Sequence, residues 1–317
     1  MEVNMDNLYA KIEKAENGDK TAQMEVANYI IFEQGDDIDS DWAERAIKYY
    51  ELAAAQGVEW AFLNLSVVYR FGKGVPKNRE KTFYWLEKAA EHLYPTAFRY
   101  LGYALQIPVG YLDENDETAD YKSAFGYFFK GAMLGDADCF YKVGDMYFSG
   151  KFVEEDKIFA FEMYKNSKNL MSFFEFSSSL ALRLGECYFY AIGTKQNLKK
   201  AKKYFEQVIE NVEEKLADGE NPYFVVRTIN RSKFLLKQLK NGKIPPAYNK
   251  NTENKITKKV IKNSENKFKF LAKRVLQEIN RSSILLEKLA YMYKTGIFVE
   301  KDLKFSAYLF EISNANQ

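Results

Sequence analysis

Side chains suited to catalysis or metal binding are scarce in this 317-residue sequence. It contains one histidine, His92, and two cysteines, Cys139 and Cys187. Nucleophilic catalysis needs a nucleophile beside a base, and a zinc site needs several histidine or cysteine ligands. No Gly-x-x-x-x-Gly-Lys-Ser/Thr phosphate loop occurs either. We therefore expect no enzyme activity and no catalytic, metal or cofactor-binding residue.

The same residues fit structural roles. His92 follows an alanine pair where a helix should end, and the two cysteines lie within apolar helical segments as buried core thiols. Carboxylates gather in one stretch that reads as an insertion loop, either solvated or a docking point for a basic partner. They are Asp113, Glu114, Asp116, Glu117 and Asp120.

The elements that would position any site repeat along the chain. Residues 61–90 predict an apolar helix, a turn at Gly72-Lys73-Gly74, and a second amphipathic helix with Asn78 as its N-cap. The same order of residues recurs from Cys139, from Leu180 and, near the end, from residue 285. Weaker or interrupted copies begin at residues 22 and 97. Such repetition predicts an array of helix pairs.

The spacing has a physical reason. A small residue on each first helix lets the second helix of the pair approach closely, and a glycine after each first helix supplies the positive φ that ends it. Neighbouring pairs then bury their apolar stripes against each other. The small residues fall at intervals of 36, 42 and 41, at Ser66, Gly102, Gly144 and Gly185.

At these residues the chain resembles the Sel1-like repeats, relatives of the tetratricopeptide repeats. The best copy, residues 61–90, matches the family pattern at eight positions: Leu65, Tyr69, Gly72, Gly74, Val75, Trp85, Ala89 and Ala90. It departs from the pattern at Ser66 and Asn78, where the family has Gly and Asp. The resemblance implies an all-α, right-handed superhelical solenoid of antiparallel helix pairs, and an adaptor or scaffold role.

The repeat signature disappears between Gly185 and Ala290. We expect helices from Leu198 to about Leu216 and from Pro222 to Leu239, then a loop over 242–255 and a basic helix over about 256–279. The domain organisation predicted is a solenoid over 1–210 with about five repeats, a divergent basic helical segment over 211–282, and a final repeat with its cap over 283–317.

Charge is unevenly distributed. Residues 221–283 carry 16 Lys and Arg against 3 Asp and Glu, within a chain whose net charge is +2. The remainder is therefore acidic. Few cysteines, a polar N-terminal stretch and no apolar run of about 20 residues favour a soluble, cytoplasmic protein without a membrane span.

Residues outside the repeat pattern are the candidates for binding a partner, because first helices stack along the concave face of repeat solenoids. On the first helices they are Asn64, Arg70, Arg99, Tyr103, Lys142, Asp145, Arg183 and Glu186. In the basic segment they are Lys258, Lys259 and Lys262.

The leading hypothesis is a non-catalytic scaffold that binds another protein in a groove. One alternative is an immunity or chaperone-like factor that neutralises a toxin or secreted effector, steered by the charge asymmetry. The other is nucleic-acid binding through residues 221–283, which we favour less because the same lysines fit an ordinary solvated helix face.

Overall fold

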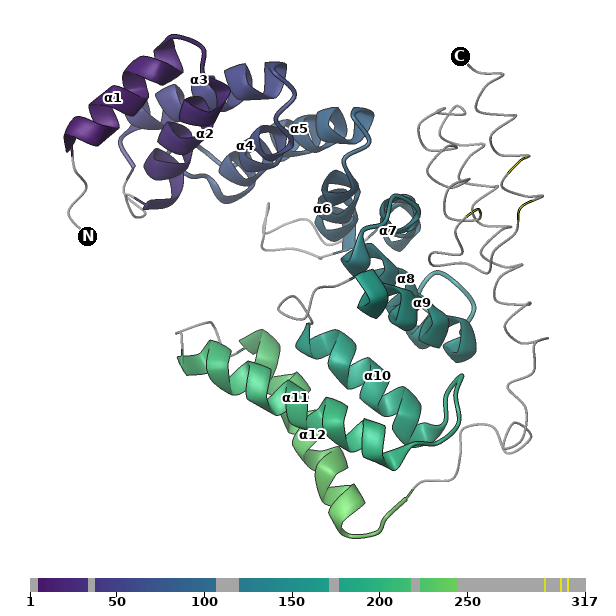
Figure 1. Ribbon diagram of the computed structural model, residues 1–317. Coiled ribbons are helices and arrows are strands. Elements are labelled where there is room, and N and C mark those ends of the chain that lie inside the picture. The colour runs from purple at the N-terminus through teal and green to yellow at the C-terminus, as the bar shows by residue number, and fades with distance from the viewer. Residues whose placement is uncertain are drawn as a thin grey trace. The chain divides into compact units, whose positions relative to one another are not determined.

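The computed structural model describes residues 5–33, 38–106, 120–170, 177–217 and 223–244, together with the single positions 294, 303 and 307. Over these residues the chain forms helices and turns and no β-strand (Figure 1). The predicted all-α fold of helix pairs is confirmed. The loop over 242–255, except its first three residues, and the basic helix over 256–279 lie outside the described residues, and the domain boundaries at 210 and 282 stay predictions.

The first of two compact units covers Met1–Tyr127. Its helices pack on their neighbours in sequence, with α2 against α3 and α4 against α5. One core of leucine, isoleucine, valine, alanine and tyrosine side chains runs through them. The helices are α1 (Met5–Glu16), α2 (Lys20–Asn28) with a π-helical turn (Tyr29–Glu33), α3 (Ser40–Ala55), α4 (Glu59–Phe71), α5 (Arg79–Glu91) and α6 (Pro95–Gln106).

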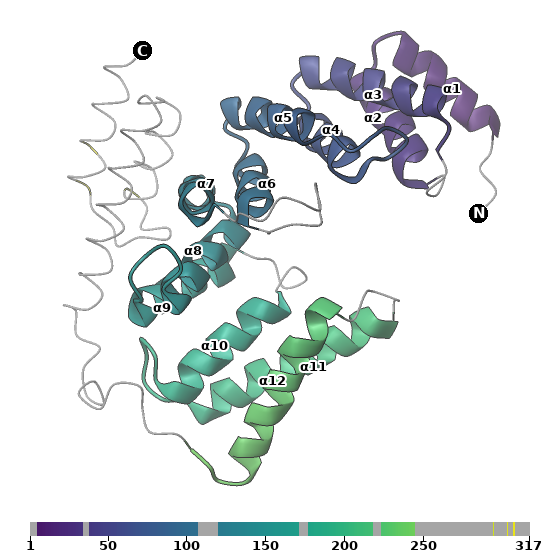
Figure 2. The ribbon, with the colours of Figure 1, turned by 180° about the vertical axis from the view of Figure 1, so that it is seen from behind.

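The second unit covers Phe128–Gln317, and α7 (Tyr121–Met133) crosses the boundary. Here α8 packs on α9, α10 on α11 and α11 on α12, and both views of the ribbon show α10, α11 and α12 side by side (Figures 1 and 2). The helices are α8 (Ala137–Ser149), α9 (Lys157–Leu170), α10 (Ser178–Tyr190), α11 (Leu198–Ala217) and α12 (Tyr223–Lys240). The two helices predicted after residue 198 are thus confirmed to within a few residues.

The turn inside each helix pair obeys the expected chemistry with one exception. Gly72 and Gly150 end α4 and α8 in the left-handed conformation, at φ of 70° and 67°. The expectation of glycine is wrong for α10, where Ala191 takes that position at φ 58°. Gly193 lies two residues later, also at positive φ. Alanine has a Cβ atom that glycine lacks, so this conformation costs it about 1–2 kcal/mol, yet the turn keeps its shape.

The predicted caps are present at the starts of the second helices. The side chain of Asn78 accepts a hydrogen bond from the backbone N–H of Lys81 at 2.8 Å. Asp156 and Asn197 do the same for the second helices of the next two complete pairs, at 2.9 Å in both. These bonds satisfy N–H groups that the first turn of a helix leaves without intrahelical partners.

Close packing within each pair depends on the small residue of the first helix. A Cβ atom placed on Gly144 would lie 2.8 Å from a ring carbon of Tyr164, and one on Gly185 would lie 2.5 Å from a ring carbon of Phe205. Those separations are shorter than carbon atoms tolerate. An aromatic ring of the second helix therefore sits directly over each of these two glycines. The close approach of the helices is the one that the repeat spacing predicts.

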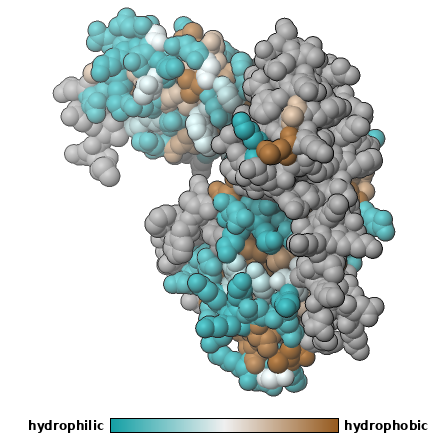
Figure 3. Space-filling view, turned by 45° about the vertical axis from the view of Figure 1, so that its right-hand side comes forward, coloured by the Kyte–Doolittle hydropathy of each residue, from teal (hydrophilic) through white to brown (hydrophobic). Residues whose placement is uncertain are grey.

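The surface of the described residues is mainly hydrophilic in the view of Figure 3, with smaller hydrophobic patches. Large apolar side chains that are at least half exposed include Trp60, Tyr84, Phe152 and Phe234. Phe152 also has a positive φ of 65°, at the place that Gly74 and Gly193 occupy in the other two turns.

Replacing Gly185 by alanine should lower the free energy of unfolding by about 1–3 kcal/mol, because the new methyl group overpacks the contact with Phe205. Gly126, within α7, is the matched control, since a Cβ there meets nothing within 4 Å. Gly126→Ala should be neutral or stabilising by up to about 1 kcal/mol. Urea unfolding measures both, and equal effects of the two substitutions would contradict the packing argument.

Candidate partner-binding surface

Three of the residues selected from the sequence meet on the first helices of the second unit. Arg183 of α10 donates from Nε to Asp145 of α8 at 2.8 Å, and from a terminal nitrogen to Glu186 at 3.1 Å. The Arg183 guanidinium also lies 4.5 Å from the centre of the Phe148 ring. The two first helices are therefore joined by an ion pair and held by stacking on an aromatic face.

The network continues onto α12 through a residue that the sequence did not single out. Arg231 donates from Nε to Glu186 at 2.9 Å and from a terminal nitrogen to the hydroxyl of Tyr190 at 3.2 Å. Helix α12 packs against α10 and α11, although it carries no repeat signature. The one available signal was an arginine inside the predicted helix, and nothing in the sequence paired it with Glu186.

A second contact that sequence reasoning did not predict is a hydrogen bond from a tyrosine of the second helix to Asp145 on the first helix. Tyr164 of α9 donates its hydroxyl to Asp145 at 3.3 Å, at the same oxygen that accepts from Arg183. One carboxylate oxygen thus joins the second helix of its own pair to the first helix of the next.

The first unit has a corresponding set of hydrogen bonds between neutral groups; such a set, which joins successive first helices through one acceptor oxygen, is called here a relay. Asn28 of α2 accepts at one oxygen from the hydroxyl of Tyr50 on α3 and from the side-chain amide of Asn64 on α4, both at 2.8 Å. Asn64 and Arg183 both lie two residues before the small residue of their helix, Ser66 and Gly185. The contact between successive first helices therefore recurs, with amides in one unit and charges in the other.

Burial and neighbouring charges set the electrostatics of the charged network, called here the α8–α10–α12 network (Asp145, Arg183, Glu186 and Arg231). Burial works against the charge of Arg183, but Asp145, Tyr164 and Glu186 outweigh it and raise its pKa. Lys142, on the same helix as Asp145, is different: burial lowers its pKa although Asp145 and Asp138 partly offset the effect.

Exposure decides which members can meet a partner. The side chains of Asp145 and Arg183 are 29% and 27% exposed and that of Arg231 is 41% exposed, whereas Glu186 is 8% exposed. Glu186 is thus the buried centre of the network, and its neighbours keep donors and acceptors at the surface. The arrangement can form directional, charge-assisted hydrogen bonds with polar groups of another molecule.

The remaining predicted residues lie elsewhere. Arg70 on α4 is 8% exposed, with its guanidinium 5.4 Å from the centre of the Phe71 ring, so it offers a partner little surface. On α6, Arg99 lies 5.7 Å from the centre of the Tyr100 ring, and Tyr103 is half-buried. Three further candidates lie outside the described residues: Lys258, Lys259 and Lys262.

The residues with potential for other chemistry are held in packed positions. Cys139 and Cys187 are buried free thiols, and burial, with a contribution from Glu186, raises the pKa of Cys187. His92 ends α5, and its ring stacks on Tyr94 with centroids 5.6 Å apart. Among the described residues no group of three His, Cys, Asp or Glu could hold a metal ion, and no helix there has the length and apolarity to cross a membrane.

Comparison with known proteins gives a family match. The family model described as Sel1 repeat matches residues 20–58, 63–92, 99–136, 138–169, 178–211 and 286–316. The chain is similar to the solved structure of a Sel1 repeat protein from Oxalobacter formigenes, at 19% identity over 98% of this chain and 76% of that one, with a TM-score of 0.49.

It is also similar to c5321, a protective antigen of uropathogenic Escherichia coli strains with an SLR fold, at 19% identity over 96% of this chain and 79% of that one, with a TM-score of 0.46. No curated protein matches the chain.

Removing the charge of Glu186 should destabilise the second unit. Glu186→Gln leaves two arginines without their shared carboxylate, and we expect the free energy of unfolding to fall by about 2–3 kcal/mol. The control is Glu206→Gln, because the Lys202–Glu206 pair is more than half exposed and should contribute only about 0–0.5 kcal/mol. Urea unfolding with equal losses for both variants would contradict a buried, structurally important Glu186.

The two thiols should be inert in the folded protein. Since burial raises the pKa of Cys187, little thiolate forms at about pH 8, and a buried sulfur is also shielded from reagents. Ellman's reagent should therefore react slowly with the native protein and rapidly with both thiols in urea. One thiol in the native protein that reacts as fast as glutathione would argue for an accessible, reactive cysteine.

Proposed function

Because the chain belongs to the Sel1 repeat family, whose members generally serve as scaffolds for protein interaction, we propose that it is a non-catalytic, cytoplasmic adaptor that binds another protein along its first helices. The observation that carries the proposal is the partly exposed polar surface of the α8–α10–α12 network. A partner that offers paired donors and acceptors can add to this network without disrupting its buried centre.

The charge distribution supports a polar partner instead of an apolar one. Helix α12 carries five basic residues and no acidic residue: Arg227, Arg231, Lys233, Lys237 and Lys240. It packs against α10 and α11. An acidic protein surface would complement the excess of basic residues on this helix. A toxin or secreted effector neutralised by this protein is a narrower form of the proposal.

Site-specific photo-crosslinking in the native host tests where the partner binds. We expect benzoylphenylalanine at Tyr103 or Lys142, on first helices, to give a covalent adduct with one protein. The matched control is the same group at Lys203, an exposed position on the second helix α11, which should give none. Both sites are read by mass spectrometry of the purified adduct.

Two other outcomes would contradict the proposal, and a third would narrow it. Adducts from Lys203 alone would move the interface to the second helices. Adducts with nucleic acid, removed by nuclease and weakened by salt, would favour the basic segment as the binding element. A toxin or effector in the adduct would select the immunity alternative within the adaptor class.

A further inference from the structure

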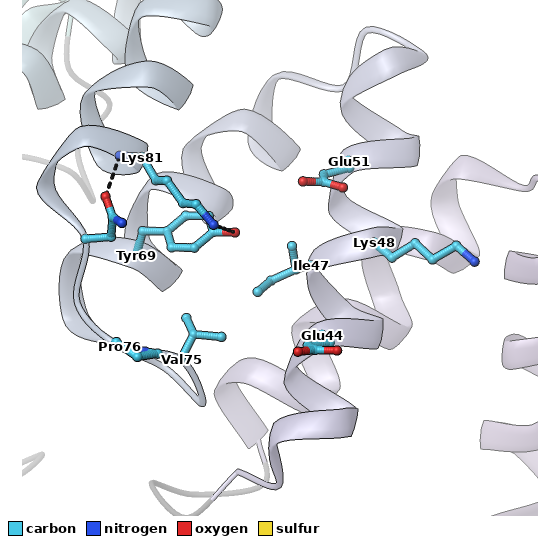
Figure 4. Close-up of a pocket in the computed structure, with 9 residues that line it drawn as sticks. Glu44, Ile47, Lys48, Glu51, Tyr69, Val75, Pro76 and Lys81 are labelled. Atoms are coloured by element: carbon cyan, nitrogen blue, oxygen red, sulfur yellow. Dashed lines mark hydrogen bonds between the residues drawn. The ribbon is translucent and has the colours of Figure 1, made fainter.

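A groove in the first unit borders α3, the second helix of its pair, and includes none of the candidate partner-binding residues. It lies between α3 and the end of α4, the following turn and the start of α5, with a volume of about 370 Å³ (Figure 4). That volume is within the range of small binding sites. The residues around it are Glu44, Ile47, Lys48, Glu51, Tyr69, Val75, Pro76, Asn78 and Lys81.

The two walls of the groove differ in character. On the α3 wall, Glu44 and Glu51 flank Ile47, and their carboxylates lie on the groove side of the helix while Lys48 points away (Figure 4). On the facing wall, the Lys81 amino group lies 4.6 Å from the centre of the Tyr69 ring and 3.4 Å from its hydroxyl. Lys81 is therefore already engaged, whereas the acidic wall faces open space.

The carboxylates of the α3 wall have no ion-pair partner among the described residues, and neither does Lys48. Lys48 and Glu51 are three residues apart but not in contact. At the corresponding place on α9, Glu162 and Lys165 do form such a pair, at 2.9 Å. The acidic groups of the groove are thus available to a ligand.

The corresponding space in the second unit is filled. Tyr188 corresponds to Tyr69, and it too has a lysine over its ring, Lys200 at 4.9 Å. There Phe161, 3% exposed, packs edge-on against Tyr188 with centroids 5.8 Å apart. Ile47 and Phe161 both stand six residues before the small residue of their helix, Ala53 and Ser167. The open space beside Tyr69 therefore distinguishes this junction from the one beside Tyr188.

We propose that this groove binds a basic segment of a protein partner: the aliphatic stem of a Lys or Arg side chain packs on Ile47 and Val75, and its charged group pairs with Glu44 or Glu51. Ile47 and Val75 are half-buried and rest on the core, so they form an apolar floor already in place. The pattern of an apolar floor with carboxylates at its rim suits these two amphipathic cationic side chains.

The length of the wall sets the spacing of the partner's charges. Seven residues of helix separate Glu44 from Glu51, about 10 Å along the axis. An extended peptide advances about 3.3 Å per residue, so basic residues at alternate positions lie about 7 Å apart on one side. Long, flexible side chains cover the remaining difference. A segment with Lys or Arg at alternate positions is therefore the expected ligand.

A synthetic peptide tests the inference directly. The probe is fluorescein-labelled Gly-Arg-Val-Arg-Gly, titrated with the full-length protein at low salt and followed by fluorescence anisotropy. We expect measurable binding that becomes about three- to tenfold weaker in the double variant Glu44→Gln/Glu51→Gln, the loss expected for two partly exposed ion pairs. Ile47→Phe, which imitates Phe161, should abolish binding while preserving the helical circular dichroism.

Matched controls distinguish peptide binding in this groove from general attraction between opposite charges. Glu80→Gln/Glu87→Gln removes the same charge from exposed positions on α5 outside the groove and should leave binding unchanged. Equal weakening in both double variants would overturn the inference, as would persistent binding to Ile47→Phe or no binding to the wild type. Preference for Gly-Glu-Val-Glu-Gly would instead assign the groove to an acidic ligand.

A further outcome would replace the partner with a second copy of the chain. If sedimentation shows that the wild-type protein is a dimer and that Glu44→Gln/Glu51→Gln is a monomer, the groove binds a second copy of the chain and the inference is overturned. The inference rests on the proposed scaffold function, because it assumes that the chain binds a protein partner. Its experiment, however, probes α3 to α5, whereas the crosslinking probes α6 and α8, so each can fail without the other.

Discussion

An aromatic ring packed directly over a glycine is the contact on which the α8–α9 and α10–α11 pairs depend. At Gly144 the ring belongs to Tyr164, and at Gly185 it belongs to Phe205; neither site has room for a methyl group. This contact fixes how close the two helices lie and at which point along their lengths they cross. The turns and caps then need only join two helices whose separation is already set.

The same packing places the polar relay. Asp145 follows Gly144 directly, so the ring that covers the glycine carries its hydroxyl to the neighbouring carboxylate. Asn28, which follows Ala27 directly, likewise accepts a hydrogen bond from the hydroxyl of Tyr50. In α10 the ring is that of Phe205, which has no hydroxyl. There Glu186 takes its hydrogen bonds from Arg183 and Arg231 instead.

These relays join successive first helices at one place in the register. A buried acceptor that lost its donors would cost more than a mismatched apolar contact, so the relays favour one pairing of neighbouring repeats over a shifted one. The first unit achieves this with amides and the second with charges. Repeats that share a backbone can therefore present different chemistry on the same face, which suits a family of interaction scaffolds.

The groove shows the same freedom on the second helices. Tyr69 and Tyr188 each have a lysine amino group over the ring, yet Tyr69 borders an open groove with Glu44 and Glu51 on its far wall, whereas Tyr188 contacts a buried phenylalanine. The difference lies in α3 and α9, at positions that the repeat signature does not constrain.

The sequence by itself determined the helix pairs, their caps and the glycines at the helix crossings. These depend on local conformation and on periodic burial, which leave a pattern at fixed spacing. It also selected Asp145, Arg183 and Glu186 as polar residues of the first helices. Only the tertiary structure paired them with one another, with Arg231 and with Tyr164, and only it opened the groove beside Ile47. Apart from the Arg183–Glu186 pair within α10, these contacts join residues about 20–45 positions apart whose side chains must meet in space, and no single repeat records its neighbour's side chains.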